Sequence, residues 1–153
     1  MRTVQAAVKL PASVHEAETA WYDTSSWPSW VDGLSRVTGV SGDWPRVGAQ
    51  VRWESGPAGR GRVRERVVAH EPLAGQTLEV EDASIEGRQT VAFAPAGDGV
   101  EVTLTLAYEL RRRSFVTPVV DLLFIRRAME RSLQTTVSHF GIELAERRTR
   151  AAD

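Results

Sequence analysis

The spacing of hydrophobic and polar residues changes along the chain. Between Val37 and Leu110, apolar side chains recur at every second position, a period typical of β-strands. The clearest example is the segment GVEVTLTLAYEL, whose inward row consists of Val100, Val102, Leu104, Leu106, Tyr108 and Leu110. Because Glu and Thr occupy the alternate positions, we expect an antiparallel sheet with one buried face and one face in solvent.

Breaks that contain glycine or proline divide this region into short strands, of which we expect six. They fall at Gly42–Pro45, Gly56–Gly61, Glu71–Gly75 and Pro95–Gly99. An earlier strand is predicted from Thr3 to Leu10, where the pattern also alternates and Pro11 ends it. The pattern therefore predicts a sheet of about seven strands.

Two short helices are expected after the first strand. Ser13 and Glu16 form a capping box, and the helix that they begin ends near Asp23, with its apolar positions at Val14, Ala17, Ala20 and Trp21. The next segment, TSSWPSW, is too interrupted for a full helix. It predicts one or two tight turns that hold Trp27 and Trp30.

A long helix is predicted at the C-terminal end. Thr117 suits its N-cap and Pro118 its first position, and the helical pattern continues to about Arg147. Thirty residues at ~1.5 Å each make a rod of roughly 45 Å. One stripe is apolar, at Leu122, Ile125, Met129, Leu133, Thr136, Phe140 and Leu144. The first half, VVDLLFI, is apolar nearly all round, so we expect it to be the more deeply buried half.

These elements predict a single α+β domain over residues 1–153. A strongly twisted antiparallel sheet cannot pack flush against a straight rod along its whole length. Where the two diverge, a gap remains whose walls are the inward apolar side chains of both. The sequence therefore predicts a ligand pocket between the sheet and the long helix.

Composition excludes several classes of function. The chain has 42% hydrophobic and 25% charged residues and a net charge of -1, which argues against nucleic acid or an anionic membrane as the main partner. Without cysteine there is no disulfide or thiol nucleophile, and the scattered histidines give no zinc spacing, so we expect no metal and no cofactor. No apolar run is long enough to span a membrane, and no signal peptide is apparent, so a cytoplasmic location is predicted.

Four stretches carry a resemblance to a known family. They are LPASVHEAETAWYDTSSWPSWVDGLSRV, RERVVAHEPLAGQTLEV, FAPAGDGVEVTLTL and RAMERSLQTTVSHF, which follow one another in the family's order over nearly the whole chain. In these stretches the chain resembles the SRPBCC (START/Bet v 1-like) superfamily, and within it the polyketide cyclase/dehydrase-like group. The resemblance implies a helix-grip fold, in which a curved sheet wraps around the C-terminal helix, and a cavity for lipids, polyketides or other small hydrophobic molecules.

Glu65 is the most informative candidate for chemistry. In RVRERVVAH it shares a face with Val63, Val67 and Ala69, which places a carboxyl group among apolar side chains. Such a group is suited to be a polar anchor or a general acid or base. A register shift of one residue would instead turn the neighbouring arginines inward.

Other candidates line the same predicted pocket. Tyr108 ends the inward row of its strand, and its hydroxyl is a second candidate for proton transfer or for binding a ligand carbonyl; the alternative is that it satisfies backbone groups at the strand end. The candidate ligand-binding residues are Trp27, Trp30, Trp53, Gln89, Phe93, Leu106, Phe124 and Met129. For any single tryptophan, plain core packing is the competing interpretation.

Arginines along one strand are expected to form a solvated face. Arg60, Arg62, Arg64 and Arg66 recur with period two, and acidic neighbours such as Glu79 and Glu81 would pair with them. Three functional hypotheses follow: binding of a small hydrophobic ligand, a polyketide aromatase/cyclase or dehydratase, and a protein-interaction module that uses Arg111–Arg113. The sequence leaves open whether the protein is a monomer or a homodimer.

Overall fold

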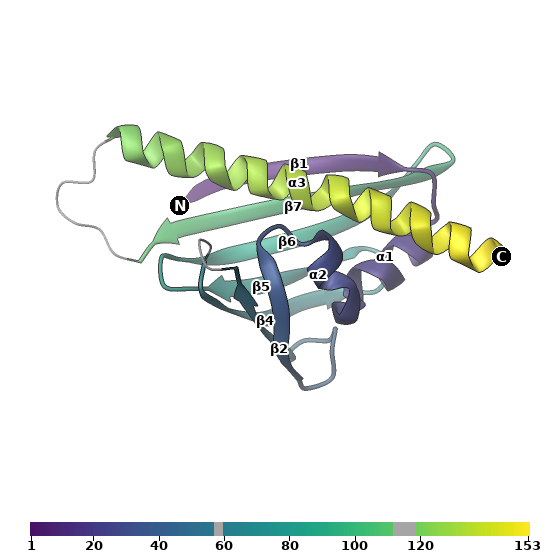
Figure 1. Cartoon of the computed structure of the whole chain (residues 1–153), viewed down its shortest axis with the longest axis horizontal. Coiled ribbons are helices and arrows are strands. Elements are labelled where there is room, and N and C mark those ends of the chain that lie inside the picture. The colour runs from purple at the N-terminus through teal and green to yellow at the C-terminus, as the bar shows by residue number, and fades with distance from the viewer. Residues whose placement is uncertain (57–59, 112–118) are drawn as a thin grey trace.

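The computed structural model describes residues 1–56, 60–111 and 119–153. Its elements follow the predicted order, and Figure 1 shows them in space. They are β1 (Arg2–Leu10), α1 (Val14–Tyr22), a 3-10 turn (Thr24–Ser26), α2 (Trp27–Trp30), β2 (Leu34–Ser41), β3 (Gln50–Ser55), β4 (Arg62–Glu71), β5 (Gly75–Glu81), β6 (Ile85–Ala96), β7 (Gly99–Leu110) and α3 (Val119–Ala152).

One antiparallel sheet contains all seven of these strands, in the order β1-β7-β6-β5-β4-β3-β2. β1 therefore lies at one edge of the sheet, paired with β7, whereas β2, the next strand along the chain, forms the opposite edge. Along β7 the even-numbered positions from Val100 to Tyr108 are buried, as the alternation predicts. This inner, buried face of the sheet is the one that the helices cover.

α3 runs the length of the molecule beside β1 and β7, while α1 and α2 lie under its second half (Figure 1). The capping box of Ser13 and Glu16 is present at the start of α1. TSSWPSW forms a 3-10 turn followed by a single turn of α-helix, so the prediction of tight turns is confirmed. α2 contacts both β2 and α3, and it joins the far edge of the sheet to the long helix.

The second half of α3 holds the core. Trp21 and Trp30 have ring centroids 4.7 Å apart, and each ring lies 4.9 Å from that of Phe140. All three side chains are buried, as are Val137 and Leu144. This aromatic cluster fixes α1, α2 and α3 against one another, because bulky rings in contact leave little freedom for any of the three helices to slide.

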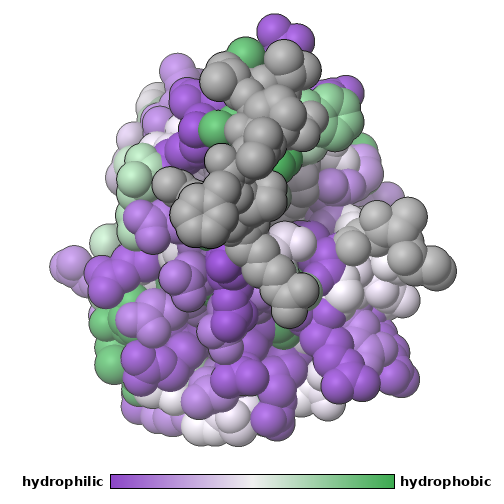
Figure 2. All heavy atoms as spheres, turned by 90° about the vertical axis from the view of Figure 1, so that its left-hand side faces the viewer, coloured by the Kyte–Doolittle hydropathy of each residue, from purple (hydrophilic) through white to green (hydrophobic). Residues whose placement is uncertain are grey.

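The prediction that the first half of α3 is the more deeply buried half is wrong. Leu123 and Phe124 are 51% and 66% exposed, and Figure 2, which views this end of the molecule, shows a mainly hydrophilic surface with isolated hydrophobic residues. The aromatic side chains of α1 and α2 pack against Phe140, in the second half of α3, so the apolar side chains at the beginning of the helix have fewer partners. The helix also continues past Arg147 to Ala152. The predicted caps Thr117 and Pro118 lie outside the described residues.

A second correction concerns β4. Val63, Glu65 and Val67 are buried as predicted, but Ala69 is exposed. The register between β4 and β5 shifts between Val67 and Ala69. Such a bulge inserts an extra residue and turns the following side chains to the other face.

Candidate functional site

A cavity of about 50 Å³ lies between the inner face of the sheet, α2 and α3. It lies where the divergence of sheet and helix predicts a pocket, but a volume this small accommodates water rather than a ligand. Its walls are mainly aromatic and aliphatic, with a few polar groups. The lining residues are Trp21, Trp27, Trp30, Val31, Asp32, Trp53, Arg60, Glu65, Leu78, Gln89, Leu104, Leu106, Met129, Ser132, Leu133 and Thr136.

Glu65 brings a carboxyl group into this apolar wall. β4 pairs it with Val51 on one side and Val80 on the other, and its side chain is only 5% exposed. Its Oε1 accepts a hydrogen bond of 3.1 Å from the indole Nε1 of Trp53. Its Oε2 is buried and has no hydrogen-bond partner among the described residues.

Burial raises the pKa of Glu65, because the charged carboxylate loses its hydration inside the protein. The hydrogen bond from Trp53 and the positive charge of Arg60 act in the opposite direction without cancelling the effect of burial. The site therefore favours a protonated carboxyl at a pH where an exposed glutamate is ionised. A carboxyl in this condition is suited to donate a proton.

Arg60 is the second charged group of the cavity, and Asp82 holds it in place. Arg60 Nε donates a hydrogen bond of 2.6 Å to Asp82 Oδ2, while Asp82 Oδ1 accepts from the backbone N–H groups of Ser84 and Ile85. The guanidinium carbon lies 5.6 Å from the centre of the Trp53 ring, within range of a cation–π interaction. Its Nη2 is buried and has no partner in the described part of the chain.

A polar clasp closes the cavity on the helix side. The backbone N–H of Asp32, in the loop after α2, donates to Thr136 Oγ1 at 3.0 Å. Ser132 Oγ donates to Asp32 Oδ2 at 2.8 Å. These two bonds tie the loop to successive turns of α3, one on each side of the cavity-lining Leu133.

The comparisons with known proteins identify the family. The family model described as polyketide cyclase / dehydrase and lipid transport matches residues 1–141. The chain belongs to this family. No curated protein sequence matches it.

Many solved structures share the fold of this member of the polyketide cyclase/dehydrase family, and three illustrate the likeness. A START superfamily protein from Mycobacterium smegmatis has a TM-score of 0.75 at 13% identity, covering 94% of this chain and 97% of its own. The di-domain ARO/CYC protein StfQ of the steffimycin biosynthetic pathway has a TM-score of 0.77 at 14% identity, and the match covers 96% of this chain and 51% of StfQ. Norcoclaurine synthase from Thalictrum flavum has a TM-score of 0.70 at 12% identity, and the match covers 96% of each chain. At these identities the likeness shows the helix-grip fold.

Seven of the ten residues predicted from sequence lie together in the cavity wall of this family member: Trp27, Trp30, Trp53, Glu65, Gln89, Leu106 and Met129. Phe124 does not, because it is exposed on the first half of α3. Phe93 is buried elsewhere in the core, with its ring 6.3 Å from Trp21 and 6.1 Å from Tyr22. These two placements correct the sequence-based list.

Tyr108 lies on the inner face but outside the residues that line the cavity. It is completely buried, and its hydroxyl has no hydrogen-bond partner among the residues that the structure describes. Burial raises its pKa. It lies two positions beyond Leu106, the last β7 residue in the cavity wall.

Sequence reasoning missed Arg60, and its interpretation of the residue was wrong. The arginines of β4 do face solvent, where Arg64 and Arg66 pair with Glu81 and Glu79 at 3.1 Å each. Arg60, however, precedes the strand, which begins at Arg62, so the alternation does not extend to it. Asp82, which holds Arg60, directly follows Glu81 in the sequence, so no local pattern distinguished it as a partner.

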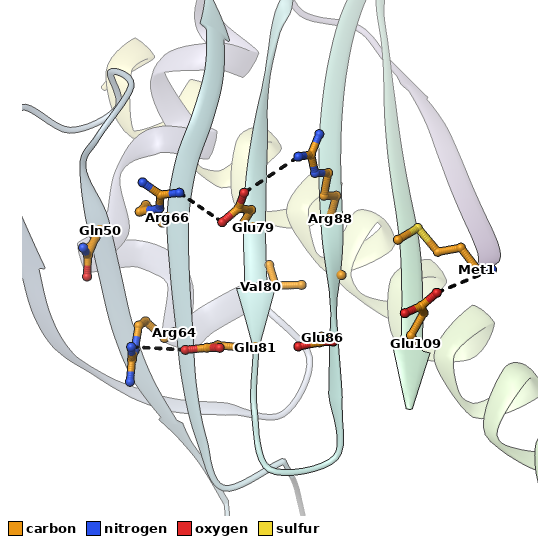
Figure 3. Close-up of a pocket in the computed structure, with 11 residues that line it drawn as sticks. Met1, Gln50, Arg64, Arg66, Glu79, Val80, Glu81, Glu86, Arg88 and Glu109 are labelled. Carbon is orange, nitrogen blue, oxygen red and sulfur yellow. Dashed lines mark hydrogen bonds and ion pairs between the residues drawn. The ribbon is translucent and has the colours of Figure 1, made fainter. Parts of the chain in front are cut away.

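A wider hollow of about 510 Å³ lies on the outer face of the sheet (Figure 3). Its side chains come mainly from β4 to β7 and are charged, with Glu79 placed between Arg66 and Arg88. These charges pair with one another and remain half exposed. Such a surface offers an apolar molecule little to bind, so the inner cavity is the better candidate despite its small volume.

Two further observations concern metal ligands and membrane-spanning helices in the described part of the chain. The described residues contain no group of three or more His, Asp or Glu side chains placed to hold a metal ion. Among the helices in the described ranges, none combines the length and the apolar character that crossing a membrane requires.

Proposed function

We propose that the protein binds a small hydrophobic molecule in the cavity between the sheet and α3, for transport or sequestration. The observation that carries this proposal is the buried Glu65, whose Oε2 has no hydrogen-bond partner among the described residues and whose surroundings in the cavity wall include several tryptophans. An unpaired buried polar atom is costly, so its retention points to a function other than packing. The family description, which names polyketide cyclase, dehydrase and lipid transport, supports the same class of ligand.

Binding requires the cavity to widen, because about 50 Å³ is well below the several hundred Å³ of a typical ligand site. The wall offers a means of widening on its helix side. Met129 is only partly buried and is unbranched, so it can change rotamer at little cost. The clasp of Asp32 with Ser132 and Thr136 consists of two exchangeable hydrogen bonds and contains no large buried side chain.

The test is the uptake of 1-anilinonaphthalene-8-sulfonate, whose fluorescence rises in an apolar site. We expect saturable binding of one probe molecule per chain, weakened in Trp53→Ala. Trp44→Ala is the matched control, because Trp44 is a partly buried tryptophan outside the cavity wall. Near-ultraviolet circular dichroism verifies that each variant is folded. Absence of uptake by the folded protein would contradict the proposal.

A second candidate function is a polyketide aromatase/cyclase or dehydratase reaction in the same cavity. The specific observation in its favour is that a carboxyl of raised pKa, Glu65, lines the same cavity as the cationic Arg60. The first is suited to transfer protons and the second to stabilise a developing enolate. Glu65→Gln should abolish turnover of a polyketide substrate and leave its binding intact; unchanged turnover would remove Glu65 from the mechanism.

Several earlier expectations remain predictions. They are the single ligand-binding domain over 1–153, the cytoplasmic location and the choice between monomer and homodimer. The interaction-module hypothesis concerns Arg111–Arg113, of which only Arg111 lies among the described residues. Arg111 donates to the backbone oxygen of Asp82, so it has a structural contact of its own.

A further inference from the structure

The outer face of the sheet carries a row of charged side chains that crosses five strands. The strand register places them directly opposite one another, and from β3 to β7 they are Arg52, Arg64, Glu81, Glu86 and Glu109. Figure 3 shows the central part of this row, with Arg64, Glu81 and Glu86 at one level of the sheet. The row therefore consists of positive charges on β3 and β4 and negative charges on β5, β6 and β7.

This order of charges is unfavourable within a single chain. Arg52 lies opposite Arg64, and Glu86 lies opposite both Glu81 and Glu109. Like charges that face each other on neighbouring strands destabilise a sheet. Where the sign changes, Arg64 and Glu81 form an ion pair at 3.1 Å. The other neighbours in the row repel one another, so the row has an unfavourable order that the fold alone does not require.

Arg52 and Glu86, on either side of the central pair, keep their charges exposed. Neither forms an ion pair within 4.0 Å in the described part of the chain. The guanidinium of Arg52 lies over β2, on the side away from Arg64, where Gly39 has no side chain to obstruct it. A Cβ atom at Gly39 would lie 3.2 Å from Arg52 Nη2. Both charges are therefore accessible to a partner molecule.

We propose that this face binds a second copy of the chain, about a two-fold axis that runs parallel to the strands and between β4 and β5. Such an axis places β4 opposite the partner's β5 and β3 opposite the partner's β6. Arg64 then faces the partner's Glu81, and Arg52 faces the partner's Glu86. A two-fold interface must be complementary to itself, and a row whose charge changes sign at the axis meets that requirement.

The neighbouring row of side chains agrees with the same axis. From β3 to β6 it consists of Gln50, Arg66, Glu79 and Arg88. The axis places Arg66 opposite the partner's Glu79, and Arg88 opposite the partner's Gln50, which is neutral. From β3 to β6, like charges therefore do not meet in either row. Sheets that stack face to face lie about 10 Å apart, a gap that an arginine and a glutamate side chain can bridge together.

Other classes of partner match this face less well. A polyanion would meet the glutamates of β5 to β7, and a cationic segment would meet the arginines of β3 and β4. A second copy presents both signs in the reverse order. Because the contact consists of partly exposed charges, we expect a dimer that is weak and sensitive to salt. This face lies on the other side of the sheet from the cavity, so the inference does not rest on the proposed function.

Sedimentation equilibrium of the full chain, from about 1 µM to about 1 mM protein, is the first measurement. We expect a monomer–dimer equilibrium at low salt. Its dissociation constant should rise about ten-fold or more between about 0.01 M and about 1 M salt, because the screening length falls from about 30 Å to about 3 Å. A chain that stays monomeric over the whole concentration range at low salt would overturn the inference.

Reversal of single charges tests which residues face each other. Arg52→Glu and Glu86→Arg each place like charges opposite one another across the axis, so each should raise the dissociation constant about ten-fold or more. Within one chain, each change replaces a like-charged neighbour by an oppositely charged one, so urea unfolding of the monomer should show no loss of stability. Glu101→Arg is the control that keeps the affinity, because Glu101 lies near the other end of β7, outside both rows.

A mixture of the Arg52→Glu and Glu86→Arg chains should recover the association that each variant alone has lost. In the mixed dimer the two introduced side chains face each other with opposite charges, and the native Arg52 of one copy faces the native Glu86 of the other. We expect a dissociation constant within about two-fold of that of the unaltered protein. Single variants that dimerise as tightly as the unaltered protein, or a mixture that associates no better than either variant, would overturn the assignment of this face.

Discussion

Glu65→Gln should change how stability depends on pH. The free energy of unfolding of this variant minus that of the unaltered protein should be larger at neutral pH than at acidic pH. Burial raises the pKa of Glu65 above its ordinary value of 4.5 in the folded protein. In the unfolded chain the pKa of the same carboxyl is about 4.3. Glutamine has nearly the same size and an oxygen for the Trp53 N–H, but it does not ionise.

The sign and size of the effect follow from proton binding. Between the unfolded and the raised folded pKa, the folded protein holds a proton on Glu65 that the unfolded chain has released. The free energy of unfolding therefore falls with rising pH, by about 1.4 kcal/mol per pH unit for one proton. Below this window the contribution of Glu65 is fully retained, and above the folded pKa its loss is complete. Glu65→Gln lacks this slope, so the stability difference between the two proteins should grow across the window.

Urea unfolding followed by tryptophan fluorescence, at intervals from about pH 4 to about pH 8, measures that difference. Glu54→Gln is the control, because the pKa of Glu54 is shifted in the opposite direction to that of Glu65. The hydrogen bond and charge of Arg36 lower the pKa of Glu54, so its stabilising contribution is lost only as the pH falls below about 4.5, and its difference stays flat above that. A Glu65→Gln difference that is also flat from about pH 4.5 upward would refute the raised pKa and with it the acid role of Glu65.

Four other substitutions test the site and the core. Trp53→Phe removes the N–H that Glu65 Oε1 accepts, so it should lower the free energy of unfolding by about 1–3 kcal/mol; a loss below about 0.5 kcal/mol would contradict that bond's importance. Ser132→Ala removes half of the clasp on the cavity, and stopped-flow mixing should show faster association of the fluorescent probe; an unchanged rate would mean that the clasp does not limit access. Phe140→Ala should cost about 3–5 kcal/mol in urea unfolding and Phe124→Ala less than about 0.5, since only Phe140 is buried; comparable losses would contradict the burial assigned to α3.

The local spacing of residues predicted helices and strands well wherever a single pattern, such as period-two alternation or a capping box, governs the segment. The period-two run ending at Tyr108 forms β7, and the capping box of Ser13 and Glu16 begins α1. Alternation also placed Glu65 on the inner face, because a strand in regular register leaves its odd and even residues no other choice. The family resemblance from sequence agrees with the fold that the chain adopts.

The errors arise where position depends on distant parts of the chain. Hydrophobicity suggested that Phe124 is buried, but burial requires a partner, and α1 and α2 lie against the other half of the helix. The bulge after Val67 exposes Ala69, and it is set by the pairing of β4 with β5. Arg60 turns inward because Asp82, twenty-two residues later, holds its guanidinium.

The sequence alone determined the strands, the helices and the identity of the buried carboxyl, because these depend on neighbours a few residues apart. Tertiary structure alone decided which polar groups meet in the cavity and how narrow it is. Arg60 comes from the loop before β4, Asp32 from the loop after α2 and Ser132 from α3, and no local rule relates them. Their meeting depends on how a curved sheet and a straight helix pack, and that is a property of the whole chain.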